Sequence, residues 1–226
     1  MKKIHNESGN IGLIALALVA GLVIAFAGTK AADNHKLNDA KKPTSTTAAA
    51  DLRSSLVTLG VQHMDLTDQA VDAALDGSSN AAATGAALYA NGNDIGAAVG
   101  SVYGKSAETT FDSVWKLHLD EFVKYAVADA KGDGASKAAA LKAIATGYTK
   151  PLSAYLAKAN PNLPEATLEK VLGEHVGMTA QMIDDHVQGK YADEAAELKQ
   201  ADQHIATIFS TLAGGIVQQY PDKFQN

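Results

Sequence analysis

The chain has 226 residues, with 25 acidic and 19 basic side chains and a formal net charge of −6. Its positive charges form no cluster, which argues against nucleic-acid binding, because the phosphate backbone demands a basic surface. The chain contains no cysteine, which excludes disulfides and thiolate metal sites.

The first 28 residues form an N-terminal hydrophobic segment. Two lysines precede an uncharged run over residues 11–28, IGLIALALVAGLVIAFAG. This run is just long enough to span a bilayer and ends in a small-residue pattern, so it predicts a cleaved signal peptide or a retained membrane anchor. A pilin-like leader cut after Gly9 is a third interpretation, although Ile14 stands where such leaders carry an acidic residue. The leading lysines stay inside, so we expect the rest of the chain to be extracytoplasmic, either secreted or anchored to the membrane.

Residues 29–50 are polar, contain few large apolar side chains and show no hydrophobic period. We interpret them as a linker. Residues 51–226 remain as one domain, because about 175 residues are enough to bury a single hydrophobic core. An alanine-rich composition with few aromatic residues favours closely packed helices over strands. The division predicts that residues 51–226 are soluble by themselves.

Six helices are expected in this domain, separated by turns that contain glycine or proline. Their ranges are 51–76, 80–103, 106–131, 135–159, 163–189 and 191–219. Pro151 lies inside the fourth range and is expected to kink or split that helix, because a proline in a helix interior removes a backbone hydrogen bond.

A repeat of about 55 residues organises the six helices. His63, His118 and His175 each precede a turn glycine by 14 residues. A repeat of this length, with a glycine turn in a fixed place, predicts one αα-hairpin per unit. The predicted fold is therefore an all-α helical bundle of three αα-hairpins. The turn glycines are Gly77, Gly132 and Gly189.

The repeated histidines are expected to share one level of the bundle. Apolar residues recur seven and four positions before each histidine and eight positions after it, so each imidazole lies on the stripe that faces the core. Each histidine is about 21 Å along the helix axis from its turn. Counting the same distance beyond each turn brings Asn91, Thr146 and His204 to this level. His204 is then expected opposite His175, across the last hairpin.

Such a layer has two interpretations. Buried histidines are commonly core residues whose nitrogens bond to carbonyls, hydroxyls or water, and duplication would repeat one such residue. Alternatively, the layer is a metal site, because imidazole is a common ligand of zinc and copper. A methionine such as Met64 would suit copper, whereas haem fits less well because the surrounding residues are not obviously small. The predicted metal ligands are His63, His118, His175 and His204.

Other motifs carry little chemistry. His118-x-x-Glu121 reverses the Glu-x-x-His order of di-iron bundles and has no partner copy. Asp184 and His186 end the fifth helix, where a solvated helix end is a simpler interpretation than a surface metal site. The sequence shows no nucleophile triad, HExxH motif or phosphate loop, so we predict no catalytic residue.

The order of several motifs resembles a family of exported, all-helical bacterial proteins without an assigned activity. The resemblance covers most of residues 51–220 and implies an exported helical fold, but it transfers no function. The motifs are His63, Asn91, Ser101-Val102-Tyr103-Gly104, Trp115-x-x-His118, Tyr125, Asn160-Pro161-Asn162-Leu163 and His175.

The leading hypothesis is an extracytoplasmic, non-enzymatic binding protein that holds zinc or copper in the histidine layer. Metal affinity is then expected to fall as the pH drops through ~6.5, where imidazole takes up a proton. The first alternative is a structural or protein-interaction domain on a membrane stalk, without metal. The second is a metal-dependent enzyme, which would need an open coordination position beside a deep pocket.

Overall fold

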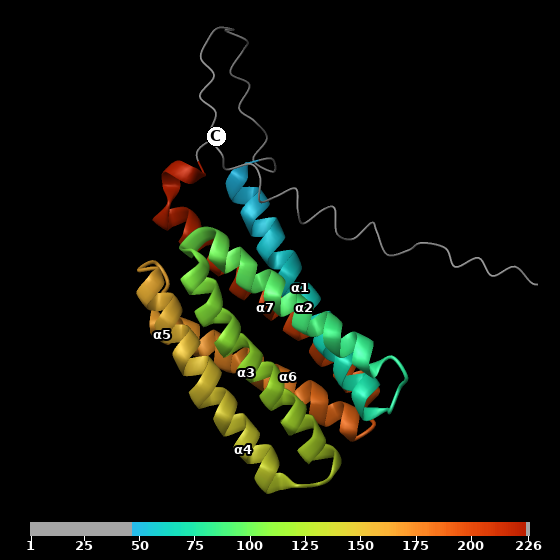
Figure 1. Ribbon diagram of the computed structural model, residues 1–226. Coiled ribbons are helices and arrows are strands. Elements are labelled where there is room, and N and C mark those ends of the chain that lie inside the picture. Colours follow the sequence, from blue (N-terminus) through green and yellow to red (C-terminus); the bar gives the residue numbers. More distant parts are fainter. Residues whose placement is uncertain (1–46, 225–226) are drawn as a thin grey trace, which may run out of the picture. The chain divides into compact units, whose positions relative to one another are not determined.

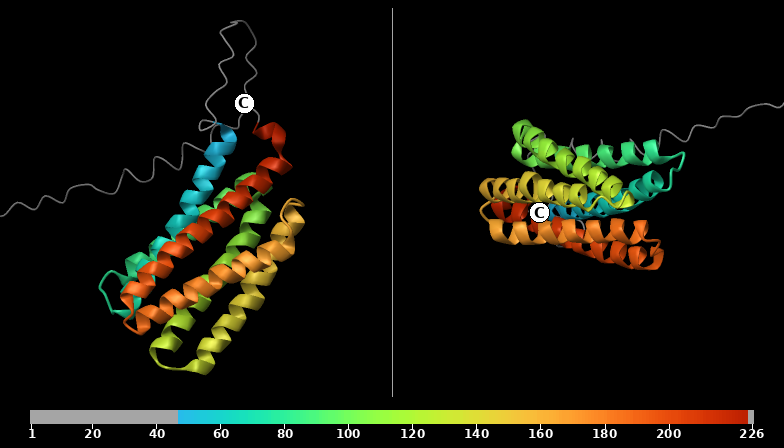
Figure 2. Two further views of the ribbon diagram at one scale, coloured as in Figure 1. Left: turned by 180° about the vertical axis from the view of Figure 1, so that it is seen from behind. Right: turned by 90° about the horizontal axis from the view of Figure 1, so that it is seen from below.

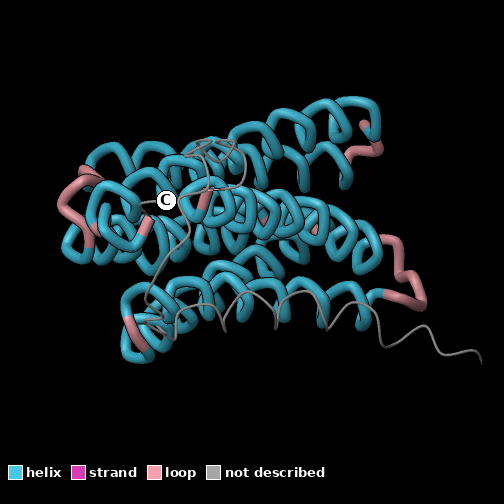
Figure 3. The backbone as a smooth tube through the Cα atoms, turned by 90° about the horizontal axis from the view of Figure 1, so that it is seen from above, coloured by secondary structure: helices cyan, strands magenta, loops and turns pink. Residues whose placement is uncertain are grey.

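The computed structural model describes residues 47–224, and all of their regular secondary structure is helical (Figures 1 and 3). This confirms the predicted all-α class. The leader predicted over residues 1–28 and most of the predicted linker lie outside the described residues. The helices are α1 (Ala48–Leu75), α2 (Ala81–Tyr103), α3 (Lys105–Ala130), α4 (Gly134–Ile144), α5 (Lys150–Ala159), α6 (Glu165–Val187) and α7 (Tyr191–Gln219), with a π-helical turn η3 (Ala145–Thr149) between α4 and α5 and a short turn η4 (Pro221–Lys223) after α7.

The ends of the helices follow local backbone chemistry. The Thr47 side chain accepts a hydrogen bond from the Ala50 N–H, so α1 begins at Ala48, inside the range expected to be linker. Gly77, Gly132 and Gly189 adopt φ angles of 64°, 67° and 69°. This left-handed conformation costs glycine little, which explains why a glycine ends the first helix of each repeat.

Pro151 divides the fourth expected helix into α4 and α5, as predicted. The two helices are joined by the π-helical turn η3, and Pro151 lies in the first turn of α5 (Figure 1). In this wider turn the Lys150 N–H bonds to the carbonyl of Ala145, five residues earlier. A proline has no N–H and crowds the preceding turn, so a local change of helix type accommodates it. The same turn brings Tyr148 and Thr149 into the interior.

Consecutive helices pack side by side, except α4 and α5, which follow one another through η3, and α7 closes the bundle against α1 (Figure 2). Helices α1, α3 and α6 also contact one another. The remaining helices cover them: α2 contacts α1 and α3, α4 contacts α3, α5 contacts α3 and α6, and α7 contacts α6 and α1. Because α2 packs against α3 as it does against α1, the contacts form a closed cycle through all the long helices, and they do not single out the three predicted hairpins as separate units.

Buried apolar side chains from the long helices fill the interior of this bundle. Between residues 47 and 224, no helix combines the length and the apolar character that crossing a bilayer requires. The inner helices α1, α3 and α6 are the ones that carry the three repeated histidines. The arrangement therefore directs one histidine from each repeat toward the centre.

Candidate metal centre

His63, His118 and His175 meet at the centre of the bundle. Their exposed fractions are 2%, 1% and 1%, which places them among the most buried side chains of the described chain. One ring nitrogen from each lies within 4.8 Å of those of the other two. The ring centre of His63 is 5.6 Å from that of His118 and 5.9 Å from that of His175. Three of the four predicted ligands thus form one compact group.

Several polar atoms of this histidine cluster have no hydrogen-bond partner within residues 47–224. They include Nδ1 of His63, Nε2 of His118 and both nitrogens of His175. Nδ1 of His118 donates to the carbonyl oxygen of Trp115, an assignment that leaves Nε2 with its lone pair free. Oδ1 of Asn91 and Nε1 of Trp115 are also buried without a partner. Buried polar groups are normally hydrogen-bonded, and an ion or a water molecule bound here would give these atoms a partner.

Burial keeps the three imidazoles neutral. It lowers the pKa of His63 to about 3, with a further contribution from His175. Burial likewise lowers the pKa of His175 to about 4, helped by His204, and holds the pKa of His118 well below its usual value, helped by His63 and His175. Neutral imidazole is the form that binds metals. The expected loss of metal affinity near pH ~6.5 therefore moves to lower pH in this site.

Two aromatic side chains enclose the cluster. The ring centre of Trp115 lies 4.9 Å from that of His63 and 4.7 Å from that of His118. Tyr148 stacks on His118 at 4.2 Å, with 20° between the ring planes. Trp115 can approach α2 because Gly92 has no side chain: a Cβ atom there would lie 2.8 Å from Cδ1 of Trp115. The π-helical turn and this glycine are features that position the rings around the histidines.

His204, the fourth predicted ligand, lies outside the histidine cluster. It is half-buried on α7, and its Nε2 donates to the carbonyl oxygen of Val171 at 2.9 Å. Thr146, expected at the same level, is exposed and donates to the Lys142 carbonyl. Counting residues from a turn gives the height of a side chain but not its rotation about the helix axis. That rotation separates these two residues from the centre.

A second cluster lies where α1 and α6 end and α7 begins. Nδ1 of His186 is 2.9 Å from both Oδ1 of Asp72 and Oε1 of Glu194, and Nε2 is 3.3 Å from Oδ1 of Asp76. Burial opposes protonation of His186, but the charges of Asp72 and Glu194 outweigh it and raise its pKa. Burial and the neighbouring Glu194 raise the pKa of Asp72 to about 6. This His186 cluster is an ion-pair network that ties three helices together.

The sequence presented Asp184 and His186 as a solvated helix end, with a surface metal site as the alternative. The structure separates them: Asp184 accepts a hydrogen bond from the Tyr125 hydroxyl at 2.6 Å and pairs with Lys137 at 2.7 Å. Sequence reasoning missed the acidic partners of His186, since Asp72 lies in another repeat. Tyr148 was missed as well, because its position depends on the π-helical turn.

Comparisons of the chain with protein-family models, with curated proteins and with solved structures gave no match.

Proposed function

We propose that this domain is a non-enzymatic binding protein that holds a transition metal ion between His63, His118 and His175. One observation carries the proposal: three buried imidazoles offer ring nitrogens within 4.8 Å of one another, and most of those nitrogens have no other partner. Nitrogen ligands on a tetrahedral zinc ion at 2.0–2.1 Å lie about 3.3 Å apart. Closing around the ion therefore asks the rings to move together by about an ångström.

Zinc is the first choice of metal, and copper is the second. Both ions bind neutral imidazole, and three protein ligands leave a fourth position for water. The ring of Trp115 packs against His63 and His118, and its unpartnered Nε1 is a hydrogen-bond donor beside the histidine cluster. Haem is a poor fit, because Trp115 and Tyr148 already pack against the histidine rings at 4.2–4.9 Å.

The surroundings favour holding a metal over catalysis. The histidine cluster contains no carboxylate among the described residues, so no acidic side chain is available there as a general base. The enclosing side chains are aromatic and apolar, which suits retention of an ion. We further propose that the protein acts outside the cytoplasm, secreted or held at the membrane through residues 1–28, on the basis of the leader sequence.

Calorimetric titration of the untagged, chelator-treated protein with zinc and copper tests this function. We expect one ion per chain with micromolar or tighter affinity. His63→Ala, His118→Ala and His175→Ala should each weaken binding at least about tenfold, whereas the matched variant His204→Ala should retain most of it. An equal loss of affinity in His204→Ala would mean that His204 is a metal ligand, as the sequence predicted. A dissociation constant above about 1 mM, or binding that is unchanged when all three histidines are replaced, would reject the metal site and mean that the histidines have a structural role only.

A further inference from the structure

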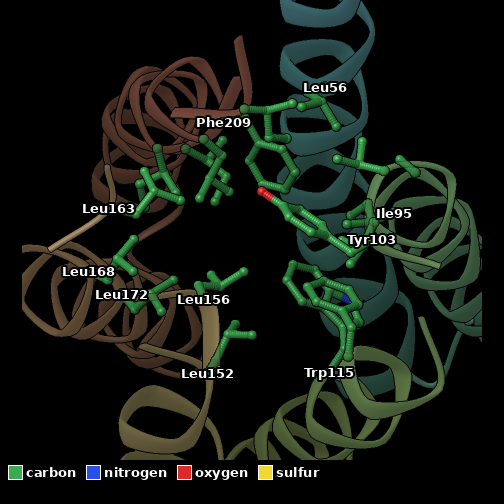
Figure 4. Close-up of a pocket in the computed structure, with 18 of the residues that line it drawn as sticks. Leu56, Ile95, Tyr103, Trp115, Leu152, Leu156, Leu163, Leu168, Leu172 and Phe209 are labelled. Atoms are coloured by element: carbon green, nitrogen blue, oxygen red, sulfur yellow. The ribbon is translucent and has the colours of Figure 1, made fainter. Parts of the chain in front are cut away.

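An apolar cavity of about 60 Å³ occupies the part of the bundle beyond Trp115, on the side away from the three turn glycines. Figure 4 shows leucines such as Leu156 and Leu172 on one side of it and Trp115 and Tyr103 on the other. The lining comes from α1, α2, α3, α5, α6 and α7, from the π-helical turn and from the loop before α6, so the cavity lies inside the bundle. It is a place where six helices leave the core incompletely filled.

The lining offers almost nothing to a polar ligand. No charged side chain contributes to it. The Tyr103 hydroxyl is already engaged, since it donates to Oε1 of Gln219 at 2.9 Å and accepts from Nδ2 of Asn160 at 3.1 Å. The other polar groups of the lining are the Tyr148 hydroxyl and Nε1 of Trp115, and Nε1 faces α2, where a Cβ atom on Gly92 would lie 2.9 Å from it. A buried water normally needs two to four polar partners, so the lining favours a dry cavity.

We propose that this cavity binds a small, uncharged, apolar molecule of a few heavy atoms. A dry protein cavity of about 150 Å³ accepts benzene or xenon, so a space of 60 Å³ suits a guest between dioxygen and a short hydrocarbon in size. A charged or strongly polar guest would lose its hydration without compensation. The half-buried lining residues Leu52, Val102 and Leu212 place the entrance where the start of α1, the end of α2 and α7 meet.

The cavity and the histidine cluster share two walls. Trp115 and Tyr148 line the cavity, and the same rings pack against His118 at 4.7 Å and 4.2 Å. A guest that moves either ring therefore changes the surroundings of the histidines. Trp115 is also the single tryptophan of the chain, so its fluorescence reports on the cavity without interference from another indole.

Xenon is the probe that tests the cavity. The full-length, chelator-treated protein is equilibrated with xenon at increasing pressure, and binding is read from quenching of Trp115 fluorescence and from the xenon NMR shift. We expect saturable binding to the wild type. Ala98→Leu, which adds three carbons to the wall, should weaken binding at least about tenfold. Ala70→Leu makes the same change at a half-buried site outside the lining and should bind as the wild type does.

If Ala98→Leu fails to fold by circular dichroism, Leu156→Phe replaces it as the filling variant. Quenching that does not saturate, or saturable binding that is equal in the wild type and a folded filling variant, overturns the proposal. Because metal is removed beforehand, the result is independent of the metal site. Xenon binding without zinc binding would retain the cavity and reject the metal proposal, and the reverse would do the opposite.

Discussion

The histidine cluster and the His186 cluster share the helices α1 and α6 and have opposite chemistry. α1 contributes His63 to the histidine cluster and Asp72 to the His186 cluster, and α6 contributes His175 and His186. Nine to eleven residues along a helix separate them by about 15 Å. In the first cluster buried histidines face one another, whereas in the second an imidazole faces carboxylates. The partners and the depth of burial, more than the residue type, decide whether a histidine here is neutral or charged.

The two clusters therefore respond to pH with opposite sign. The lowered pKa values of His63 and His175 mean that only the unfolded chain takes up protons as the pH falls below ~6.5, so stability is lost toward acid. The raised pKa of His186 means that its stabilisation is present below ~6.5 and is lost as the pH rises through its folded value. Asp72 adds to the second trend, because its pKa is raised from 3.8 to about 6.

Acidification of the metal-free protein should have the largest effect. At about pH 4, His63 and His175 should each lower the free energy of unfolding by about 3 kcal/mol relative to neutral pH, at about 1.4 kcal/mol per pKa unit. Chemical denaturation at several pH values measures this loss. His63→Leu removes one of the three buried imidazoles whose pKa values are lowered and should reduce the total loss by about a third. A profile that stays flat down to about pH 4 in the wild type would mean that the histidine cluster takes up protons while folded.

Zinc should stabilise the histidine cluster and leave the His186 cluster unchanged. At a free concentration a hundred times the dissociation constant, zinc should raise the free energy of unfolding by about 2.7 kcal/mol. Because the folded imidazoles stay neutral, the affinity measured by titration should change little between about pH 7 and pH 5.5. Three imidazoles with ordinary pKa values would lose about a thousandfold over that range, and such a loss would contradict the lowered pKa values.

Glu194→Gln should weaken the His186 cluster. Loss of the carboxylate that accepts from Nδ1 of His186 should cost about 1.5–3 kcal/mol of unfolding free energy at about pH 6. The cost should shrink in alkali, where His186 is neutral in both proteins. Asp193→Asn, one residue earlier and exposed, is the matched control and should change stability by less than about 0.5 kcal/mol. Equal effects of the two variants would show that His186 does not depend on this carboxylate.

Gly92→Ala should disturb the histidine cluster from outside. The added methyl group would lie 2.8 Å from Cδ1 of Trp115, and relieving that contact should cost about 1–3 kcal/mol by thermal or chemical denaturation. In Gly85→Ala, on the same helix, the methyl group meets no atom within 4 Å, and the higher helix propensity of alanine should stabilise by up to about 1 kcal/mol. Two variants that shift stability in the same direction would argue against close packing of Trp115 on α2.

Features that depend on neighbouring residues could be predicted from the sequence. Helix ends, the left-handed turns at Gly77, Gly132 and Gly189 and the interruption at Pro151 all follow from backbone preferences that act within a few residues. The 14-residue spacing between each histidine and its turn predicts that the three histidines lie at the same height in the bundle, because a helix rises by a constant amount per residue. Because the apolar stripe turns each histidine inward, His63, His118 and His175 converge.

The rotation of each helix about its axis and the packing of helices against one another are visible only in the folded structure. This packing directed His204 to the carbonyl of Val171, assembled Asp72, His186 and Glu194 from two distant repeats and placed Tyr148 over His118. It also left the apolar cavity beside Trp115. These features depend on side chains far apart in the chain, whose distances follow from the packing of whole helices and not from any local pattern.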